Sequence, residues 1–173
     1  MPVSSPNGGD QEHQKLVTFA LGGQTFGAPI RSVKETLPPR PVTPAFLVPS
    51  LVAGFINLRG EVVAVLDLGN LLELDAETTR ADERSIIILR STGARSSDKA
   101  AAGLLVDRLL GVVSVAAADV RPPPPTLAAE PASYLRGVVS YGDPPAPLLL
   151  LDPERVLATE RLRPFRRGKG AAA

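Results

Sequence analysis

The sequence predicts a mostly-β protein built from small sheets or barrels. Its 18 prolines and 15 glycines divide 173 residues into short stretches, and the apolar stretches between them have the length of single strands. Many of these stretches contain Val and Ile, which favour strands. A weak internal repeat indicates two copies of one β unit. The expected strands are residues 16–21, 26–30, 62–66, 86–89, 103–106, 112–115 and 148–151.

The first two strands are expected to form a hairpin, because Gly22-Gly23 between them can adopt the positive φ of a tight turn. Two short helices are expected after later strands. Asp67 stands at an N-cap position before residues 68–72, and Asp152 is followed by Pro153 at the first helical position. The stretch 91–102 is small, polar and contains glycine, which is typical of a flexible loop between strands.

The two helix starts belong to the internal repeat. A proline-marked connection precedes each copy, at residues 37–39 and 120–122. Two copies of a small β unit explain the pattern most simply, and chance similarity is the alternative. One copy contains Leu58-Arg59-Gly60, Val62-Val63 and Leu66-Asp67, and the other contains Leu135-Arg136-Gly137, Val138-Val139 and Leu151-Asp152.

The composition argues against most chemistry. Lys and Arg total 19 and Asp and Glu total 18, so the net charge of +1 creates no field that would attract nucleic acid. The chain has no cysteine and a single histidine, His13, in a polar leader. It contains none of the nucleophile, zinc-protease, phosphate-loop or dinucleotide motifs. We therefore expect a protein that is not an enzyme and has no catalytic residues, cofactor or metal site.

Two observations bear on the location of the protein. Residues 1–14 are polar and lack the apolar stretch of a signal peptide. The longest apolar stretches are far shorter than the roughly 20 residues of a membrane span. We expect a cytoplasmic protein without direct membrane insertion. Residues 161–173 contain several Arg and Lys and end in Ala, which indicates a flexible basic tail.

The stretch GFINLRGEVVAVLDL at residues 54–68 closely resembles the signature of the CheW family of chemotaxis coupling proteins. Other stretches resemble family elements in the same order, and together they cover residues 15–158. They are FALGGQTFGAPI at 19–30 for the opening hairpin, VKE at 33–35 for the V-x-E element, GLLVDR at 103–108 for a central strand, and YLRGV at 134–138 with LLLD at 149–152 for the closing elements.

This resemblance implies two intertwined SH3-like five-stranded β-barrels packed over a shared hydrophobic seam. We expect a flexible leader at 1–14, a first barrel at about 15–80, a second at about 81–160 with exchangeable boundary strands, and the tail at 161–173. The resemblance also implies an adaptor with two partners: the cytoplasmic tip of a methyl-accepting chemotaxis receptor, and the regulatory domain of a CheA-type histidine kinase. It allows self-association in receptor arrays at the inner membrane.

A candidate binding surface follows from the same resemblance. Glu35 and Arg59 match family residues in or beside a receptor-facing groove, and an arginine can hold a carboxylate through two hydrogen bonds. The alternative is that Arg59 pairs with Glu35 only to fix its own turn. The remaining candidates for binding receptor or kinase are Val33, Gly54, Asn57, Gly60, Val106 and Val112.

Several of these candidates also suit structural roles. Val33, Val106 and Val112 would fit a core, Gly54 a turn with positive φ, and Asn57 a local backbone cap. The chain departs from the family at Ala64, where Pro is usual, and at Thr36, where an aliphatic residue is usual. Both departures bear on the expected affinity for a receptor and leave the expected fold unchanged.

Two other functions stay open at this point. The same adaptor could serve a non-flagellar chemosensory pathway that governs gliding, type IV pili or development. A pair of small barrels could also bind nucleic acid, which would need a basic face with stacking aromatic residues. Aromatic residues make up 4% of the chain, so this second alternative is the weaker one.

Overall fold

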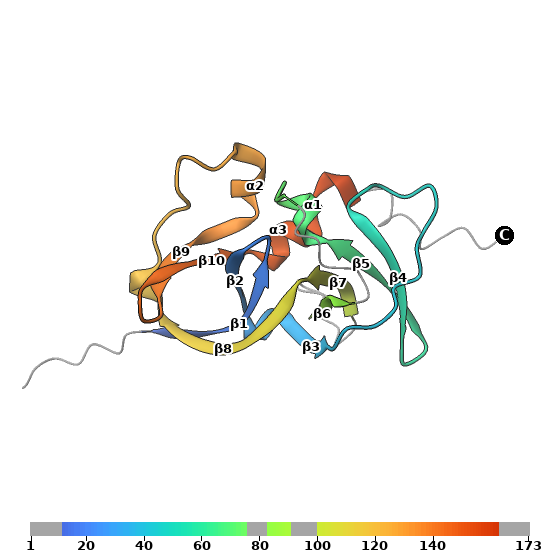
Figure 1. The fold of residues 1–173 in the computed structure, drawn as a ribbon, viewed down its shortest axis with the longest axis horizontal. Helices are drawn as coiled ribbons and strands as arrows, with labels where there is room; N and C mark the ends of the chain where they lie inside the picture. The colour runs from blue at the N-terminus through green and yellow to red at the C-terminus, as the bar shows by residue number, and fades with distance from the viewer. Residues whose placement is uncertain (1–11, 76–82, 91–99, 163–173) are drawn as a thin grey trace, which may run out of the picture.

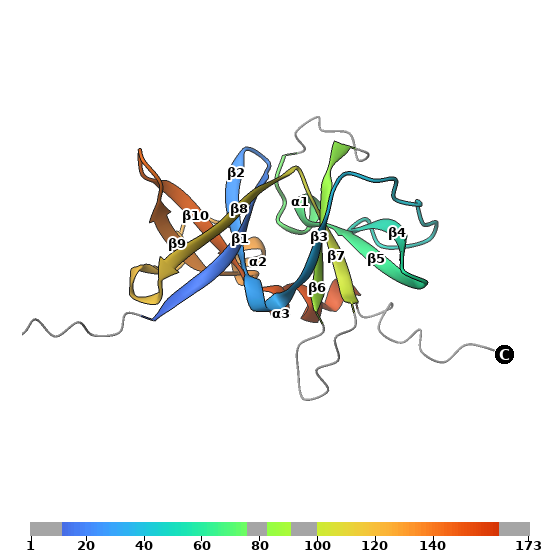
Figure 2. The same cartoon turned by 90° about the horizontal axis from the view of Figure 1, so that it is seen from below.

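The computed structural model describes residues 12–75, 83–90 and 100–162, which form two five-stranded β-sheets and a few short helices (Figure 1). Sheet A has the strand order β8-β1-β2-β10-β9, and sheet B has the order β3-β6-β7-β5-β4. The sheets lie side by side (Figure 2). The expected mostly-β fold with two SH3-like five-stranded units is confirmed. The pairing among the described residues leaves each sheet open rather than closing it into a complete barrel.

The strands of sheet A are β1 (His13–Leu21), β2 (Gln24–Pro29), β8 (Arg108–Ala116), β9 (Leu135–Tyr141) and β10 (Ala146–Leu151). Those of sheet B are β3 (Val33–Leu37), β4 (Val52–Leu58), β5 (Glu61–Asp67), β6 (Ser85–Arg90) and β7 (Ala100–Val106). The helices are α1 (Leu68–Leu71), α2 (Ala129–Ser133) and α3 (Pro153–Ala158), with the 3-10 turns η1 (Ile30–Ser32), η3 (Ala117–Asp119) and η4 (Glu160–Leu162).

Both sheets have the same topology. Each has a central antiparallel pair, β1 with β2 in sheet A and β6 with β7 in sheet B. An antiparallel edge strand, β8 or β3, flanks one side of this pair. A parallel strand, β10 or β5, flanks the other side and continues the sheet into an antiparallel hairpin with β9 or β4. The repeat suggested by the sequence is therefore present in the fold.

The register of the repeat differs from the expected one. The N–H of Asp67 donates to the carbonyl of Leu51 at 2.7 Å, and the N–H of Asp152 donates to that of Tyr134 at 2.8 Å. Val52 at the start of β4 is thus equivalent to Leu135 at the start of β9. The expected match of residues 58–60 with 135–137 is wrong, because Leu58 ends β4 and residues 59–60 form the turn to β5, whereas residues 135–137 begin β9. Hydrophobic and glycine residues recur often enough in strands to allow such a shift.

The two sheets exchange strands. Sheet B is built from residues 33–106, whereas sheet A combines residues 13–29 with residues 108–151. The expected boundary near residue 80 falls between β5 and β6, which belong to the same sheet. The chain passes from sheet A to sheet B through η1, and it returns at Asp107 between β7 and β8.

Both ends of the described chain add to the fold. His13 and Gln14, expected in the leader, begin β1 and pair with β8. Arg161 and Leu162, expected in the tail, belong to η4, and Leu162 is buried in the core. The rest of the expected leader (1–11), most of the expected loop at 91–102 (residues 91–99) and the rest of the expected tail (163–173) lie outside the described residues.

The core consists of three apolar clusters. One lies within sheet A, around Leu16, Val139 and Leu150, and another lies within sheet B, around Ile56, Val65 and Ile88. The largest cluster lies between the sheets and is the expected shared seam. Successive side chains of a strand point to opposite faces of the sheet. Alternate residues therefore enter the seam, and the residues between them enter the cluster within their own sheet. The members of the seam include Val17, Phe19, Phe26, Leu149 and Leu151 from sheet A, and Val33, Leu66, Ile87, Leu104 and Val106 from sheet B.

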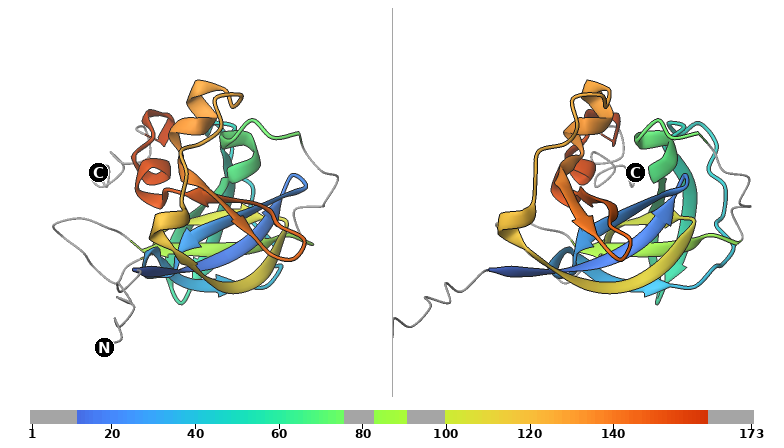
Figure 3. Two further views of the ribbon diagram at one scale, coloured as in Figure 1. Left: turned by 90° about the vertical axis from the view of Figure 1, so that its left-hand side faces the viewer. Right: turned by 60° about the vertical axis from the view of Figure 1, so that its left-hand side comes forward.

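The three α-helices lie on one side of the molecule, opposite β3 and β8 (Figures 1 and 3). Helices α1 and α3 begin at the expected caps. The Asp67 carboxylate accepts the N–H of Asn70 at 3.1 Å, and the Asp152 carboxylate accepts the N–H groups of Glu154 and Arg155. Within the described ranges, no helix has both the length and the apolar character to cross a bilayer.

Candidate binding groove

A groove of about 400 Å³ lies between the edge strands β3 and β8, so it has one sheet on each side. Sheet B contributes the wall formed by β3, sheet A contributes the wall formed by β8, and Ile30 of η1 lies where the chain passes between the sheets. The groove is lined by Val17, Ile30, Val33, Lys34, Glu35, Thr36, Arg90, Leu109, Gly111 and Val112.

Both walls contain an irregularity in strand pairing. On β3, Val33 pairs with Leu89 and Glu35 with Ile88, so the register shifts across Lys34. On β8, the register shifts between Leu109 and Gly111. Irregularities of this kind bend an edge strand and redirect its side chains, which blunts the edge against unwanted strand pairing.

The groove has an apolar surface that is exposed among the residues the structure describes. Val112 is 58% exposed and Ile30 is 42% exposed, whereas Val33 is almost completely buried at the base of the β3 wall. Lys34, Glu35 and Arg90 supply charged groups around this surface. An amphipathic helix with an apolar ridge fits such a surface better than a small polar ligand does.

Glu35 and Arg59 form an ion pair beside the groove. The Nη1 and Nη2 atoms of Arg59 donate to the two carboxylate oxygens of Glu35 at 3.1 and 3.0 Å. Their side chains differ in exposure, at 20% for Glu35 and 75% for Arg59. The turn that carries Arg59 is fixed locally, because Asn57 Oδ1 accepts the N–H of Gly60 at 2.9 Å. Glu35 lies on β3, Asn57 lies on β4, and Arg59 and Gly60 form the turn between β4 and β5. The fold thus brings these four residues together.

The other candidates occupy different environments. Val33 and Val112 lie on opposite walls of the groove. Val106 is fully buried in the seam and takes no part in lining the groove. Gly54 lies in β4, where a Cβ atom would collide with the carbonyl of Thr43. Arg90 and Leu109 were absent from the sequence-based candidates, because only the topology places them beside β3, and Ile30 was absent although it lies just before β3 in the chain.

The lining of the groove is apolar and charged. In the part of the chain that the structure describes, no group of three His, Cys, Asp or Glu side chains is placed to hold a metal ion. The described histidine, His13, lies in β1 and does not line the groove. The groove therefore presents shape, apolar area and charge to a partner.

The chain is similar to known proteins along most of its length. The family model for a CheW-like domain matches residues 15–161. A "Chemotaxis protein CheW" from Treponema pallidum is 29% identical over 157 residues, which cover 89% of this chain and 88% of that protein. "Protein FrzA" from Myxococcus xanthus is 32% identical over 151 residues, covering 87% of this chain and 89% of that protein.

Two further similarities concern a kinase and a solved structure. The "Chemotaxis protein CheA" of Salmonella typhimurium is 30% identical over 97 residues, which cover 55% of this chain and 13% of that protein. The crystal structure of scaffolding protein TtCheW from Thermoanaerobacter tengcongensis has the same fold, with a TM-score of 0.67 and 24% sequence identity. That alignment covers 82% of this chain and 90% of the other.

Proposed function

The chain belongs to the CheW family of chemotaxis signalling proteins, and from that membership we propose that it is a non-enzymatic adaptor. It couples the cytoplasmic tip of methyl-accepting chemoreceptors to a CheA-type histidine kinase. It acts in the cytoplasm and is recruited to receptor arrays at the inner membrane. Adaptors of this kind transmit a signal by contacting two receptor conformations unequally.

The groove between β3 and β8 is the observation that supports the receptor contact most directly. It joins an exposed apolar surface on Val112 and Ile30 to charged groups on Glu35 and Lys34. The helical tip of a receptor can place an i, i+3, i+4 row of apolar side chains against such a surface. Glu35 and Arg59 at its side can exchange their mutual pair for contacts with that helix.

The similarity to a segment of a CheA protein supports the kinase contact. That segment is 30% identical to this chain over 97 residues. Two chains with related folds can associate through related surfaces, as subunits of oligomers do. One adaptor has to hold both partners at once, so the kinase contact involves a surface other than the receptor groove.

Substituting Val112 with Glu is expected to weaken binding to a soluble receptor cytoplasmic fragment about tenfold or more, because it places a carboxylate in the apolar part of the groove. Thermal unfolding should be unchanged, because Val112 is exposed. Binding to the regulatory domain of the kinase should also be unchanged. Isothermal titration calorimetry with each partner measures these affinities.

Val62→Glu is the matched control for this variant. Val62 is 75% exposed on β5 and lies outside the groove, so Val62→Glu should bind the receptor fragment as the wild type does. Equal affinities for wild type, Val112→Glu and Val62→Glu would contradict the groove as receptor site. If the wild-type protein sediments with neither receptor-bearing membranes nor the kinase, the adaptor function itself fails.

A charge swap separates the two roles of the ion pair. The double variant Glu35→Arg with Arg59→Glu can re-form the pair, so its free energy of unfolding should stay within about 1 kcal/mol of wild type, as expected for an exposed pair. Receptor affinity should fall about tenfold, because a partner would meet both charges reversed. If the double variant binds the receptor fragment as tightly as the wild type does, the pair serves only to fix the turn.

A further inference from the structure

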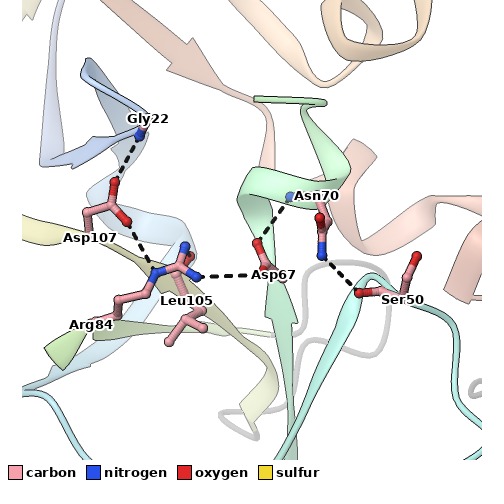
Figure 4. A network of polar contacts seen from close by, with 7 residues as sticks. All are labelled: Gly22, Ser50, Asp67, Asn70, Arg84, Leu105 and Asp107. Carbon is pink, nitrogen blue, oxygen red and sulfur yellow. Dashed lines mark hydrogen bonds and ion pairs between the residues drawn. The ribbon is translucent and has the colours of Figure 1, made fainter. Parts of the chain in front are cut away.

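We propose that Arg84, with Asp67 and Asp107, forms a polar joint that holds the two sheets at one angle and thereby sets the width of the groove between β3 and β8 (Figure 4). The joint itself stands on the geometry alone. Its consequence for receptor binding rests on the proposed function.

On the side of sheet B, Arg84 precedes β6 and reaches across the end of the sheet. Its Nη1 lies 3.4 Å from Asp67 Oδ2 at the end of β5. Its Nη2 donates to the carbonyl of Leu105 in β7 at 3.5 Å. The second oxygen of Asp67 caps α1, and Asn70 of that helix donates to the carbonyl of Ser50 at 3.1 Å. Arg84 is thus fixed to β5 and β7 of sheet B, and through Asp67 to the start of α1.

On the side of sheet A, Asp107 receives the other end of the guanidinium. Arg84 Nε lies 3.2 Å from Asp107 Oδ1. The second oxygen of Asp107 accepts the N–H of Gly22, in the turn between β1 and β2, at 2.8 Å. The backbone N–H of Asp107 donates to the carbonyl of Ala20 at 3.0 Å. A single side chain therefore connects the β1–β2 hairpin to Arg84 and so to sheet B.

Burial strengthens this connection, because solvent and salt screen a buried ion pair less than an exposed one. The side chains of Arg84 and Asp107 are 12% and 13% exposed, and that of Asp67 is 23% exposed. Apolar contacts along the rest of the seam oppose separation of the sheets without pairing a donor with an acceptor, since the hydrophobic effect has no direction. The guanidinium donates to Asp67 Oδ2 and to the Leu105 carbonyl, whereas its buried Nε faces Asp107 Oδ1 without hydrogen-bond geometry. Charge attraction between these partly buried groups therefore holds Arg84 to Asp107.

The joint lies next to the strand that forms one wall of the groove. Asp107 immediately precedes β8, and Leu109, Gly111 and Val112 of β8 line the groove. The opposite wall, β3, belongs to sheet B. A change in the angle between the sheets at Asp107 must therefore move β8 relative to β3. The width of the groove therefore changes with the angle between the two sheets.

Spin labels at the two far ends of the molecule test the joint. The chain has no cysteine, so Glu61→Cys in sheet B and Ser140→Cys in sheet A give unique labelling sites, both exposed. Pulsed electron resonance on the full chain should give one narrow distance distribution. Arg84→Met should broaden it about twofold by releasing a hinge between the sheets. Arg161→Met, which removes only the exposed pair with Glu130, should leave it unchanged.

Arg84→Lys covers the case in which Arg84→Met does not fold. Lysine keeps a cation near the carboxylates but lacks the planar guanidinium that contacts Asp67, Asp107 and the Leu105 carbonyl from three nitrogens, so the distribution should again broaden. A width equal to wild type in Arg84→Lys overturns the joint. Affinity for the receptor fragment should fall about fivefold or more in Arg84→Lys. If wild type binds no receptor fragment, the adaptor function fails while the distance measurement still decides the joint.

Discussion

Gly54→Ala is expected to lower the free energy of unfolding by about 3–5 kcal/mol, combining backbone strain with overpacking. Gly54 has φ of +153°, and a Cβ atom there would fall on the Thr43 carbonyl, 2.8 Å from its carbon and 2.9 Å from Val42 Cγ1. Thr43 and Phe55 exchange two backbone hydrogen bonds of 2.9 Å across this contact. The methyl group would break them, and chemical denaturation measures the loss.

Gly111→Ala is the matched control for this prediction. Gly111 has φ of +147°, close to that of Gly54, and no atom lies within 4 Å of the position of its Cβ. This variant carries only the backbone strain, about 1–2 kcal/mol. Equal losses for Gly54→Ala and Gly111→Ala would contradict the role of the Thr43 contact.

Phe19→Ala is expected to destabilise the protein by about 3–5 kcal/mol, the usual cost of removing a buried aromatic side chain. Phe19 is fully buried in the seam between the sheets. Its ring stacks on that of Phe26, with centroids 5.7 Å apart and planes at 12°. The cavity would open where both sheets meet, so the midpoint of thermal unfolding should fall in a single transition followed by circular dichroism.

Phe46→Ala removes the same atoms from a side chain that is 91% exposed. Its free energy of unfolding should stay within about 0.5 kcal/mol of wild type, as for surface substitutions generally. If Phe19→Ala instead unfolds in two separate transitions, the sheets do not share one cooperative core.

Much of the fold could be predicted from the sequence, and the exceptions have a common cause. Each expected strand lies within an observed strand except for Ile30, which begins η1. The strands missing from the expected set are β3, β4 and β9, and all of them are sheet edges. Polar residues such as Lys34 in β3 and Arg136 in β9 interrupt the apolar run that marks a central strand, whereas β4 keeps an apolar run at residues 51–56 that is divided by Gly54.

The candidate site could be predicted only in part. Family resemblance led to Glu35 and Arg59, which the structure places in contact although they are 24 positions apart. No local pattern relates Val33 to Val112. Val33 follows the crossing into sheet B at η1, and Val112 follows the return to sheet A at Asp107. Gly54 required the structure, since a glycine imposed by close approach of another strand looks like any turn glycine in sequence. Its counterpart Gly137, beside Arg121 in sheet A, has the same constraint.

The division of sheet A into two distant segments bears on how the protein folds during synthesis. On a ribosome, the β1–β2 hairpin emerges first, but its partners β8 and β10 begin at Arg108 and Ala146. Sheet B needs no residue beyond Val106 and can form earlier. The finished sheet B then offers its apolar face to Phe19 and Phe26 of the waiting hairpin. Translation therefore favours a fixed order, in which the continuous sheet forms first and serves as the template on which the divided sheet is completed.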